Sequence, residues 1–174
     1  AERRSVSSTE QGMRYLLAIS LLTLSCEQAR RADPEIHLIP SGYRGKVQIA
    51  FKAQNGVASR VENAAHVYEI PADGLLLTQA APNEGVGPAS RFFFVTPEGE
   101  RQPVTRIYTS SEGLSSEVGI AFLRKGRFQA GQPAACDIPM YEYFVGNDAD
   151  LAAADESTYY LKLWPFLRDH YECQ

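Results

Sequence analysis

The feature that most constrains this chain is a series of short β-prone segments, separated by turn residues, between residues 35 and 145. The pattern is clearest at residues 47–51, where apolar side chains alternate with polar or small ones. Such alternation is typical of a strand with one buried face. Proline and glycine at positions 40–45 favour a tight turn just before it, because proline fixes φ and glycine adopts angles that other residues avoid. We therefore predict that residues 36–51 form a hairpin or a corner that starts a β-sandwich.

Turn signals divide the rest of this region in the same way. Asn55-Gly56 is typical of a hairpin turn, and Pro71–Gly74 predicts a turn with Gly74 at positive φ. Residues 129–139 are expected to form a loop after a strand that ends near Gly126. The predicted strands after the first turn are 66–70, 75–79, 91–95, 103–108, 118–123 and 140–145. About seven or eight short strands at this spacing indicate a mainly β fold, an antiparallel β-sandwich.

From about residue 148 the pattern changes to that of a helix. Apolar residues recur at spacings of three and four from Tyr160 to Tyr171. Pro165 interrupts this pattern, which favours a break or two short helices. We expect a C-terminal helical segment whose apolar face packs on one sheet or its edge.

Composition excludes some classes of function. The chain has 174 residues, of which 44% are hydrophobic and 22% charged, as in an ordinary globular domain. Its formal net charge of −4 argues against a nucleic-acid partner, which usually selects a basic surface. No apolar run reaches the roughly 18 residues that a membrane-spanning helix needs. We expect one domain over residues 35–174, with no cofactor.

Residues 13–26 have the order of a secretory signal peptide. Arg14 is followed by a mostly apolar run, then by Ser25 and Cys26. The ending at residues 22–26 resembles a bacterial lipobox, a signal in which the cysteine becomes the lipid-modified first residue of the mature protein. Leu24 departs from that pattern, since a small residue is commoner there. The alternative is an ordinary amphipathic or buried helix of the fold.

This interpretation divides the N-terminal part of the chain. Residues 1–25 are expected to be a leader and signal peptide, and the polar residues 26–34 a tether. Lipid on Cys26 would be the membrane partner. The predicted location is therefore the bacterial cell envelope, facing the periplasm or exposed at the surface.

Two sequence words carry a resemblance to a known family. They are Ile36-His37-Leu38-Ile39-Pro40-x-Gly42-Tyr43-x-Gly45 with its following strand, and Tyr68-Glu69-Ile70-Pro71-x-x-Gly74-Leu75-Leu76-x-Thr78. Over roughly residues 35–110 the chain resembles an uncharacterised family of bacterial envelope lipoproteins, a domain of unknown function. The resemblance implies an envelope location and a β fold, and it brings no catalytic residues.

The residue types that usually carry chemistry do not form a recognisable set in the sequence. The three histidines, at positions 37, 66 and 170, have no metal-ligand spacing with the cysteines. Ser41 lacks the Gly-x-Ser-x-Gly frame of a hydrolase. The acidic residues from Asp148 to Glu156 lack the glycine and distal glutamate of a calcium loop, so helix capping is favoured over calcium binding. We predict no catalytic residues and no metal site.

Two further expectations concern aromatic residues and cysteines. Phe93 and either Tyr141 or Tyr143 are candidates for an outward-facing binding surface, although aromatic residues on strands more often belong to the core. Cys136 and Cys173 are predicted to form a disulfide, because lipid on Cys26 leaves them as a pair in an oxidising compartment. Two unpaired thiols are the alternative.

The leading functional hypothesis is an envelope-anchored lipoprotein that acts as a non-enzymatic binding or accessory module, with a protein or a cell-wall polymer as partner. The alternative is a small periplasmic hydrolase or carbohydrate-active enzyme whose acidic residues converge only in the fold. A deep pocket that collects carboxylates with His37 or His66 would favour the enzyme. Shallow surfaces with exposed aromatic residues would favour binding.

Overall fold

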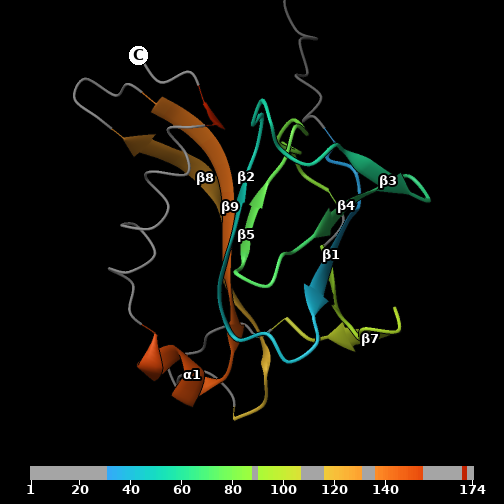
Figure 1. Cartoon of the computed structure of the whole chain (residues 1–174), viewed down its shortest axis with the longest axis vertical. Coiled ribbons are helices and arrows are strands. Elements are labelled where there is room, and N and C mark those ends of the chain that lie inside the picture. Colours follow the sequence, from blue (N-terminus) through green and yellow to red (C-terminus); the bar gives the residue numbers. More distant parts are fainter. Residues whose placement is uncertain (1–30, 88–89, 107–115, 131–135, 155–169, 172–174) are drawn as a thin grey trace, which may run out of the picture. The chain divides into compact units, whose positions relative to one another are not determined.

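A computed structural model describes residues 31–87, 90–106, 116–130, 136–154 and 170–171 (Figure 1). The described residues form nine strands and one short helix. The strands are β1 (Glu35–Pro40), β2 (Gly45–Ala50), β3 (Arg60–Glu62), β4 (Ala65–Glu69), β5 (Leu75–Leu77), β6 (Arg91–Val95), β7 (Arg101–Val104), β8 (Gly119–Ala130) and β9 (Cys136–Gly146), and the helix is α1 (Asp148–Ala153). The mainly β prediction is confirmed.

The strands form two mixed sheets. One has five strands in the order β3-β4-β1-β6-β7, and the other has four in the order β5-β2-β9-β8. The prediction of purely antiparallel sheets is wrong, because β1 pairs in parallel with β4 and β6, and β2 pairs in parallel with β5. The cause is that consecutive strands often enter different sheets, so the neighbours within one sheet are not consecutive in the chain.

The first turn is a corner. The amide of Tyr43 donates to the carbonyl of Pro40 at 3.0 Å, and Gly42 and Gly45 have φ values of 80° and 126°. These left-handed angles turn the chain sharply. As a result β1 and β2 lie in different sheets, so the alternative of a hairpin does not apply.

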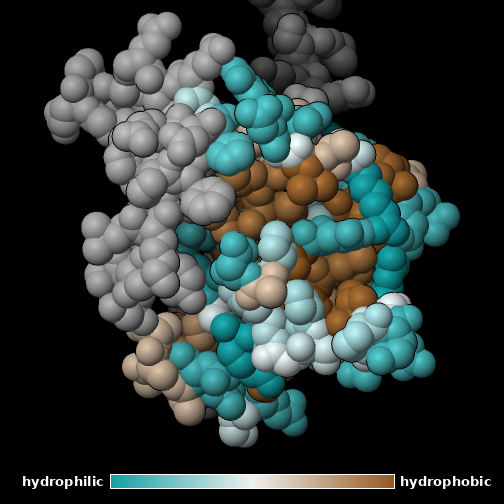
Figure 2. All heavy atoms as spheres, in the orientation of Figure 1, coloured by the Kyte–Doolittle hydropathy of each residue, from teal (hydrophilic) through white to brown (hydrophobic). Residues whose placement is uncertain are grey.

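One hydrophobic core draws on both sheets. Its buried members are Ile39, Val47, Ile49, Phe51, Tyr68, Ile70, Leu76, Ala80, Phe92, Ile120, Tyr141, Tyr143 and Val145. On the face shown in Figure 2, hydrophobic residues gather in the middle and hydrophilic residues surround and cross them. A second cluster, built on Ile36, Leu38 and Val67, occupies the other side of β1. Strand β1 is therefore buried on both faces, which gives it a central place in the molecule.

Strands β8 and β9 are longer than the sequence predicts. Gly126 lies inside β8, paired with Met140, so the expectation that the strand ends there is wrong. Strand β9 begins at Cys136, inside the predicted loop. Pairing continues through Arg127 and Pro139 to the ends of both strands. Hydrogen-bonded pairing between β8 and β9 keeps residues 126–139 in strands wherever the structure describes them, although their glycine and proline content favours a loop.

The hairpin expected at Asn55-Gly56 is also corrected. A turn exists there, with the Gly56 amide donating to the Ala53 carbonyl at 3.1 Å, but β2 pairs with β5 and β9 and not with the next strand, β3. The hairpin lies later, between β3 and β4. Its turn residues Asn63 and Ala64 have φ values of 48° and 61°.

Helix α1 begins with a capping box. The Asn147 side chain accepts from the Asp150 amide at 3.0 Å, and the Asp150 carboxylate accepts from the Asn147 amide at 3.0 Å. This is the capping role that the acidic run predicts. Among the described residues, α1 is six residues long and no helix could cross a membrane. The apolar helical pattern at 155–169 lies outside the described residues.

One described residue of the C-terminal part contacts a sheet. The Tyr171 hydroxyl donates to the Phe51 carbonyl at 2.7 Å, and its ring packs against the cluster formed by Ala50, Ile138 and Met140. Tyr171 therefore packs on the four-stranded sheet, as the predicted apolar pattern requires of this position.

Candidate functional site

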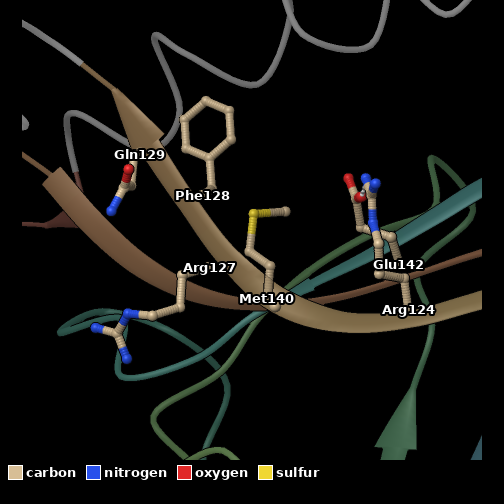
Figure 3. Close-up of a pocket in the computed structure, with 7 residues that line it drawn as sticks. Arg124, Arg127, Phe128, Gln129, Met140 and Glu142 are labelled. Atoms are coloured by element: carbon tan, nitrogen blue, oxygen red, sulfur yellow. Dashed lines mark hydrogen bonds and ion pairs between the residues drawn. The ribbon is translucent and has the colours of Figure 1, made fainter.

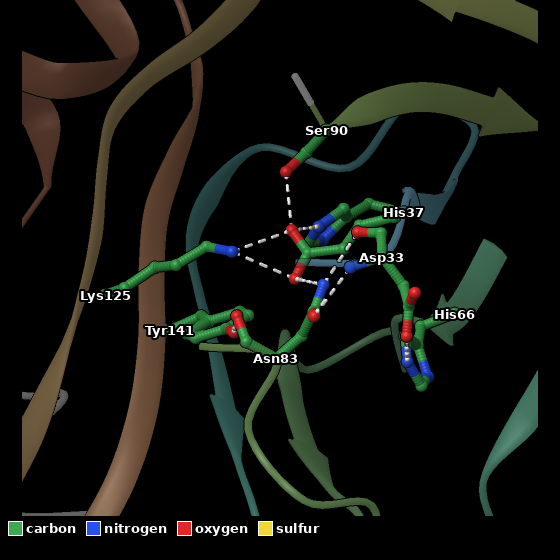
Figure 4. A network of polar contacts seen from close by, with 8 residues as sticks. Asp33, His37, His66, Asn83, Ser90, Lys125 and Tyr141 are labelled. Atoms are coloured by element: carbon green, nitrogen blue, oxygen red, sulfur yellow. Dashed lines mark hydrogen bonds and ion pairs between the residues drawn. The ribbon is translucent and has the colours of Figure 1, made fainter. Parts of the chain in front are cut away.

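The most concentrated group of polar side chains surrounds Glu35, at the start of β1 (Figure 4). The carboxylate is 2% exposed. One oxygen accepts from Asn83 Nδ2 at 3.0 Å and the other from Ser90 Oγ at 2.6 Å. Lys125 Nζ donates to both oxygens, at 2.9 and 3.0 Å. Four donated hydrogen bonds therefore hold a carboxylate that lies almost entirely inside the protein.

The ion pair of Glu35 with Lys125 joins the two sheets, since Glu35 belongs to β1 and Lys125 to β8. The Lys125 ammonium also lies 4.3 Å from the centre of the Tyr141 ring, where a cation is attracted to the aromatic face. Burial alone would raise the pKa of Glu35, but the nearby His37 ring, the hydrogen bonds from Ser90 and Lys125 and the Lys125 charge outweigh it and lower the pKa to about 2. Glu35 is thus ionised at every physiological pH.

Asn83 holds the loop before β6 against the start of β1. Its side-chain oxygen accepts from the Asp33 amide at 3.0 Å, and its side-chain nitrogen donates to the Asp33 carbonyl at 2.8 Å. Its own carbonyl accepts from the Tyr141 hydroxyl at 2.7 Å. Nearby, His66 Nε2 lies 3.3 Å from Asp33 Oδ2. These contacts fix the backbone that carries Glu35.

His37 lies two residues further along β1 on the same side, and it is fully buried. Its ring stacks on Phe92 with 4.6 Å between centroids, and Tyr68 and Tyr143 lie at 5.1 and 5.3 Å. Among the described residues neither ring nitrogen has a hydrogen-bond partner, and the distance from Nε2 to the Glu35 carboxylate is 4.0 Å. Burial lowers the pKa of His37, Glu35 opposes that change, and Lys125 adds to it. The ring is therefore neutral at neutral pH.

This geometry does not suit acid–base catalysis. A carboxylate with a pKa near 2 is a weak base. Its two oxygens already accept hydrogen bonds from Asn83, Ser90 and Lys125. Ser90 donates to Glu35 and not to a histidine, so it is not activated as a nucleophile. The His37 ring is sealed from solvent. The group around Glu35 fits an electrostatic clamp between the sheets better than a reaction centre.

The clamp predicts a two-stage acid sensitivity. Since the unfolded chain binds a proton on His37 near pH 6.5 and the folded chain resists it, the free energy of unfolding falls as pH drops below 6.5. Glu35 contributes stability above pH 4.5 that is lost as pH falls through about 2, an effect of about 3 kcal/mol. Urea unfolding at a series of pH values measures both stages.

Two variants separate the stages. His37→Phe, which suits the aromatic surroundings, is expected to remove the loss of unfolding free energy between pH 7 and 5. Glu35→Gln is expected to remove the loss of unfolding free energy below pH 4.5. If the His37→Phe chain kept the wild-type slope between pH 7 and 5, the first assignment would be wrong.

The structure places the sequence-predicted residues in different environments. Tyr141 and Tyr143 are 3% and 2% exposed in the core, so neither offers a surface to a ligand. Phe93 is half-buried against the cluster of Ile36, Leu38 and Val67. Burial raises the pKa of the Tyr143 hydroxyl well above its usual value. Whether an aromatic residue of β6 or β9 is buried depends on which face of its strand points inward. Alternation in the sequence does not identify that face.

The cysteines fall at or beyond the limits of the described residues. Cys136 is the first residue of β9, where its backbone pairs with Ala130. Cys26 and Cys173 lie outside the described residues. The disulfide and the lipid site therefore stay predictions.

The sequence did not single out Glu35, Asn83, Ser90 or Lys125. The partners of Glu35 lie 48, 55 and 90 residues away in the chain. The local sequence offers one signal, Glu35 directly before residues 36–39 with His37 two positions later. This spacing indicates a polar inner face of the strand, but it does not identify the partners of Glu35.

Two of three comparisons relate the chain to known proteins. A crystal structure named "Putative Lipoprotein from Bacillus anthracis" has a similar fold, with a TM-score of 0.50 and 20% sequence identity over 67% of this chain and 71% of that one. A search of curated proteins finds no match. The model of a family of unknown function, DUF6843, matches residues 31–132, which is more than half of the chain and includes Glu35 and all three of its side-chain partners. The chain therefore belongs to the family of unknown function DUF6843.

Proposed function

We propose that this protein is a lipoprotein of the bacterial cell envelope, anchored by lipid on Cys26, whose domain over residues 35–174 is a non-enzymatic binding or accessory module. In this proposal residues 1–25 are leader and signal peptide and residues 26–34 are the tether. The body is a β-sandwich, a description supported by the core that both sheets share. Its partner is a protein or a cell-wall polymer.

The burial of Glu35 and His37 is the observation that favours binding over catalysis. They are the carboxylate and histidine at the centre of the polar group, and they are 2% and 0% exposed. The carboxylate is occupied by Lys125 and two further donors. Catalytic groups usually need access to substrate and a pKa near the working pH. The hydrolase alternative therefore has less support.

The envelope location has separate support. The order of residues in 13–26 matches a lipoprotein signal. The similar crystal structure carries the word lipoprotein in its name, at 20% identity. Acyl chains contribute about 0.8 kcal/mol per buried CH₂, so several chains on one cysteine anchor a protein firmly.

Changing Cys26 to alanine is expected to move the protein from the membrane fraction to the soluble or the uncleaved pool, because the acceptor of the lipid is gone. Membrane fractionation with intact-mass analysis of the full chain measures this. Cys136→Ala, a cysteine change in β9, is the matched control and should stay with the membrane. A Cys26→Ala protein that partitions with membranes and is processed like the wild type would sink the lipoprotein proposal.

A further inference from the structure

Three large hydrophobic side chains are exposed in the part of the chain that the structure describes. They are Val57, Val61 and Val86, with exposed fractions of 61%, 59% and 75%. A single exposed valine is ordinary on a protein surface. Exposed apolar side chains become informative when they gather at one end of a domain, because apolar surface in one place often marks a contact.

Two of these valines flank the place where the chain enters β1. Val86 pairs with Arg31, the first described residue. Val61 pairs with His66, whose amide donates to the Pro34 carbonyl at 2.8 Å, directly before β1. Both valines therefore lie at the start of β1.

Val57 lies at the same end, in the loop after β2. It bridges to Thr78, whose amide donates to the carbonyl of Ala50 at the end of β2. Strands β1 and β2 both extend away from the corner at residues 41–44, so the start of β1 and the end of β2 are both remote from that corner. Figure 1 shows the corner toward the bottom of the view and the loops after β2 and β5 toward the top. We call Val57, Val61 and Val86 the valine surface.

A hollow of about 420 Å³ beside β8 and β9 is less suited to a partner (Figure 3). The Glu142 carboxylate there already accepts from Arg124 and from Gln48, and it lies 3.2 Å from the Lys46 ammonium. Met140, which also lines the hollow, is 3% exposed. The apolar surface that a partner can reach is therefore the valine surface.

The length of chain before β1 connects the valine surface to a membrane. Residues 31–33 are already bonded to the body, through the Ala32 amide and through the Asn83 side chain. In the proposed lipoprotein, five peptide steps separate Cys26 from Arg31. Each step spans at most about 3.6 Å, so Arg31 stays within roughly 18 Å of the lipid-modified cysteine. The valine surface is therefore the part of the body that the anchor keeps nearest to the lipid headgroups.

The charges at this end favour a lipid surface without net charge. Arg31 and Lys52 are exposed there, and so are Asp33 and Glu84. Two cations balanced by two anions give little attraction to an anionic bilayer. Exposed apolar side chains beside balanced charges suit the boundary between headgroups and acyl chains, where an apolar face enters to a depth of about 5–10 Å.

We propose that the valine surface contacts the bilayer and sets how the domain stands on the membrane. The partner is a zwitterionic lipid surface. This rests on the proposed lipid anchor at Cys26 and adds a second, apolar contact made by the folded domain itself. The opposite end, with the corner at residues 41–44 and the turn between β6 and β7, then faces away from the membrane.

Quenching of tryptophan fluorescence by brominated lipid tests this contact. The chain has one tryptophan, so Trp164→Phe in the full chain supplies a background without that signal. The protein is purified from membranes in detergent and placed in phosphatidylcholine vesicles, either unbrominated or brominated near the top of one acyl chain. On bromination, Val86→Trp and Val57→Trp should each lose about half of their fluorescence or more. Glu98→Trp, exposed in the turn between β6 and β7, is the matched control and should lose less than about a tenth.

A second change tests whether the valines act together. Val86→Asp in the Val57→Trp chain should reduce quenching at position 57 by about twofold or more, because a carboxylate resists entry into the bilayer. Equal quenching at positions 86 and 98, no quenching at 57 and 86, or quenching that high salt abolishes would overturn the inference. If Val86→Trp lowers the midpoint of thermal unfolding, Val57→Trp decides the matter alone.

These outcomes are distinct from failure of the lipid anchor. Flotation of the chain with the vesicles reports the anchor, and the Cys26→Ala chain should not float. If the chain floats through Cys26 while position 86 is not quenched, the anchor stands and the valine contact falls. If the Cys26→Ala chain floats equally well with position 86 quenched, the contact stands and the anchor falls. A chain with Cys26 intact that does not float would overturn both.

Discussion

Replacing Lys125 with methionine is expected to lower the free energy of unfolding by about 2–4 kcal/mol at pH 7, since it leaves the buried Glu35 carboxylate without its counter-charge. Methionine keeps most of the unbranched side chain and removes the ammonium that bonds Glu35 and lies over the Tyr141 ring. The value is set below the full effect of a broken buried pair because the Lys125 side chain is 39% exposed. Chemical denaturation of the full chain measures it.

The pH dependence identifies the cause. Without Lys125 the pKa of Glu35 rises, so the carboxyl group accepts a proton more readily and the deficit is smaller at pH 4 than at pH 7. The double variant Glu35→Gln/Lys125→Met removes both charges and should be more stable at pH 7 than Lys125→Met alone. Additive effects of the two single changes, with no dependence on pH, would show that the two groups are not coupled.

A surface ion pair provides the comparison. Arg60 contacts Glu62 and Glu69, and its side chain is 49% exposed. Arg60→Met is expected to change the free energy of unfolding by less than about 1 kcal/mol, because exposed pairs are screened by water. A loss as large as that of Lys125→Met would remove the special role assigned to the Glu35 clamp.

Gly74→Ala is expected to destabilise the protein by about 3–4 kcal/mol, through backbone strain and crowding together. Gly74 has a φ of 80°, which residues with a Cβ rarely adopt. An added Cβ would lie 2.6 Å from the Lys46 carbonyl and would overlap the Tyr43 hydroxyl, which donates to that carbonyl at 2.5 Å. The Gly74 carbonyl also accepts from the Gln48 amide at 2.8 Å, so the strain reaches β2 directly.

Gly99→Ala separates strain from crowding. Gly99 has a φ of 89° in the turn between β6 and β7, and an added Cβ there has no neighbour within 4 Å in the part of the chain that the structure describes. This change should lower the free energy of unfolding by about 1 kcal/mol, from backbone strain alone. Equal losses for the two variants in urea unfolding would mean that the contact with Tyr43 and Lys46 has no energetic effect.

The local sequence was sufficient where the determinants are local. Gly74 adopts the positive φ that its turn predicts, and the acidic run from Asn147 forms a helix cap. The strand at 91–95 has the predicted bounds. In each case the preference belongs to a few adjacent residues, such as a missing Cβ, a short side-chain acceptor or a run of aromatic residues.

The sequence alone determined that this is a mainly β protein with short strands, a first turn built on Gly42 and Gly45, and a signal-like segment that ends at Cys26. The tertiary structure decided which face of each strand is inside. In β1 the polar Glu35 and His37 point into the shared core, and Lys125 reaches Glu35 from 90 residues away. Alternation shows that a strand has two different faces, but only the strands packed against it decide which face is buried and what neutralises a charge there. The parallel pairings of β1 and β2 were decided in the same way, because they depend on partners far apart in the chain.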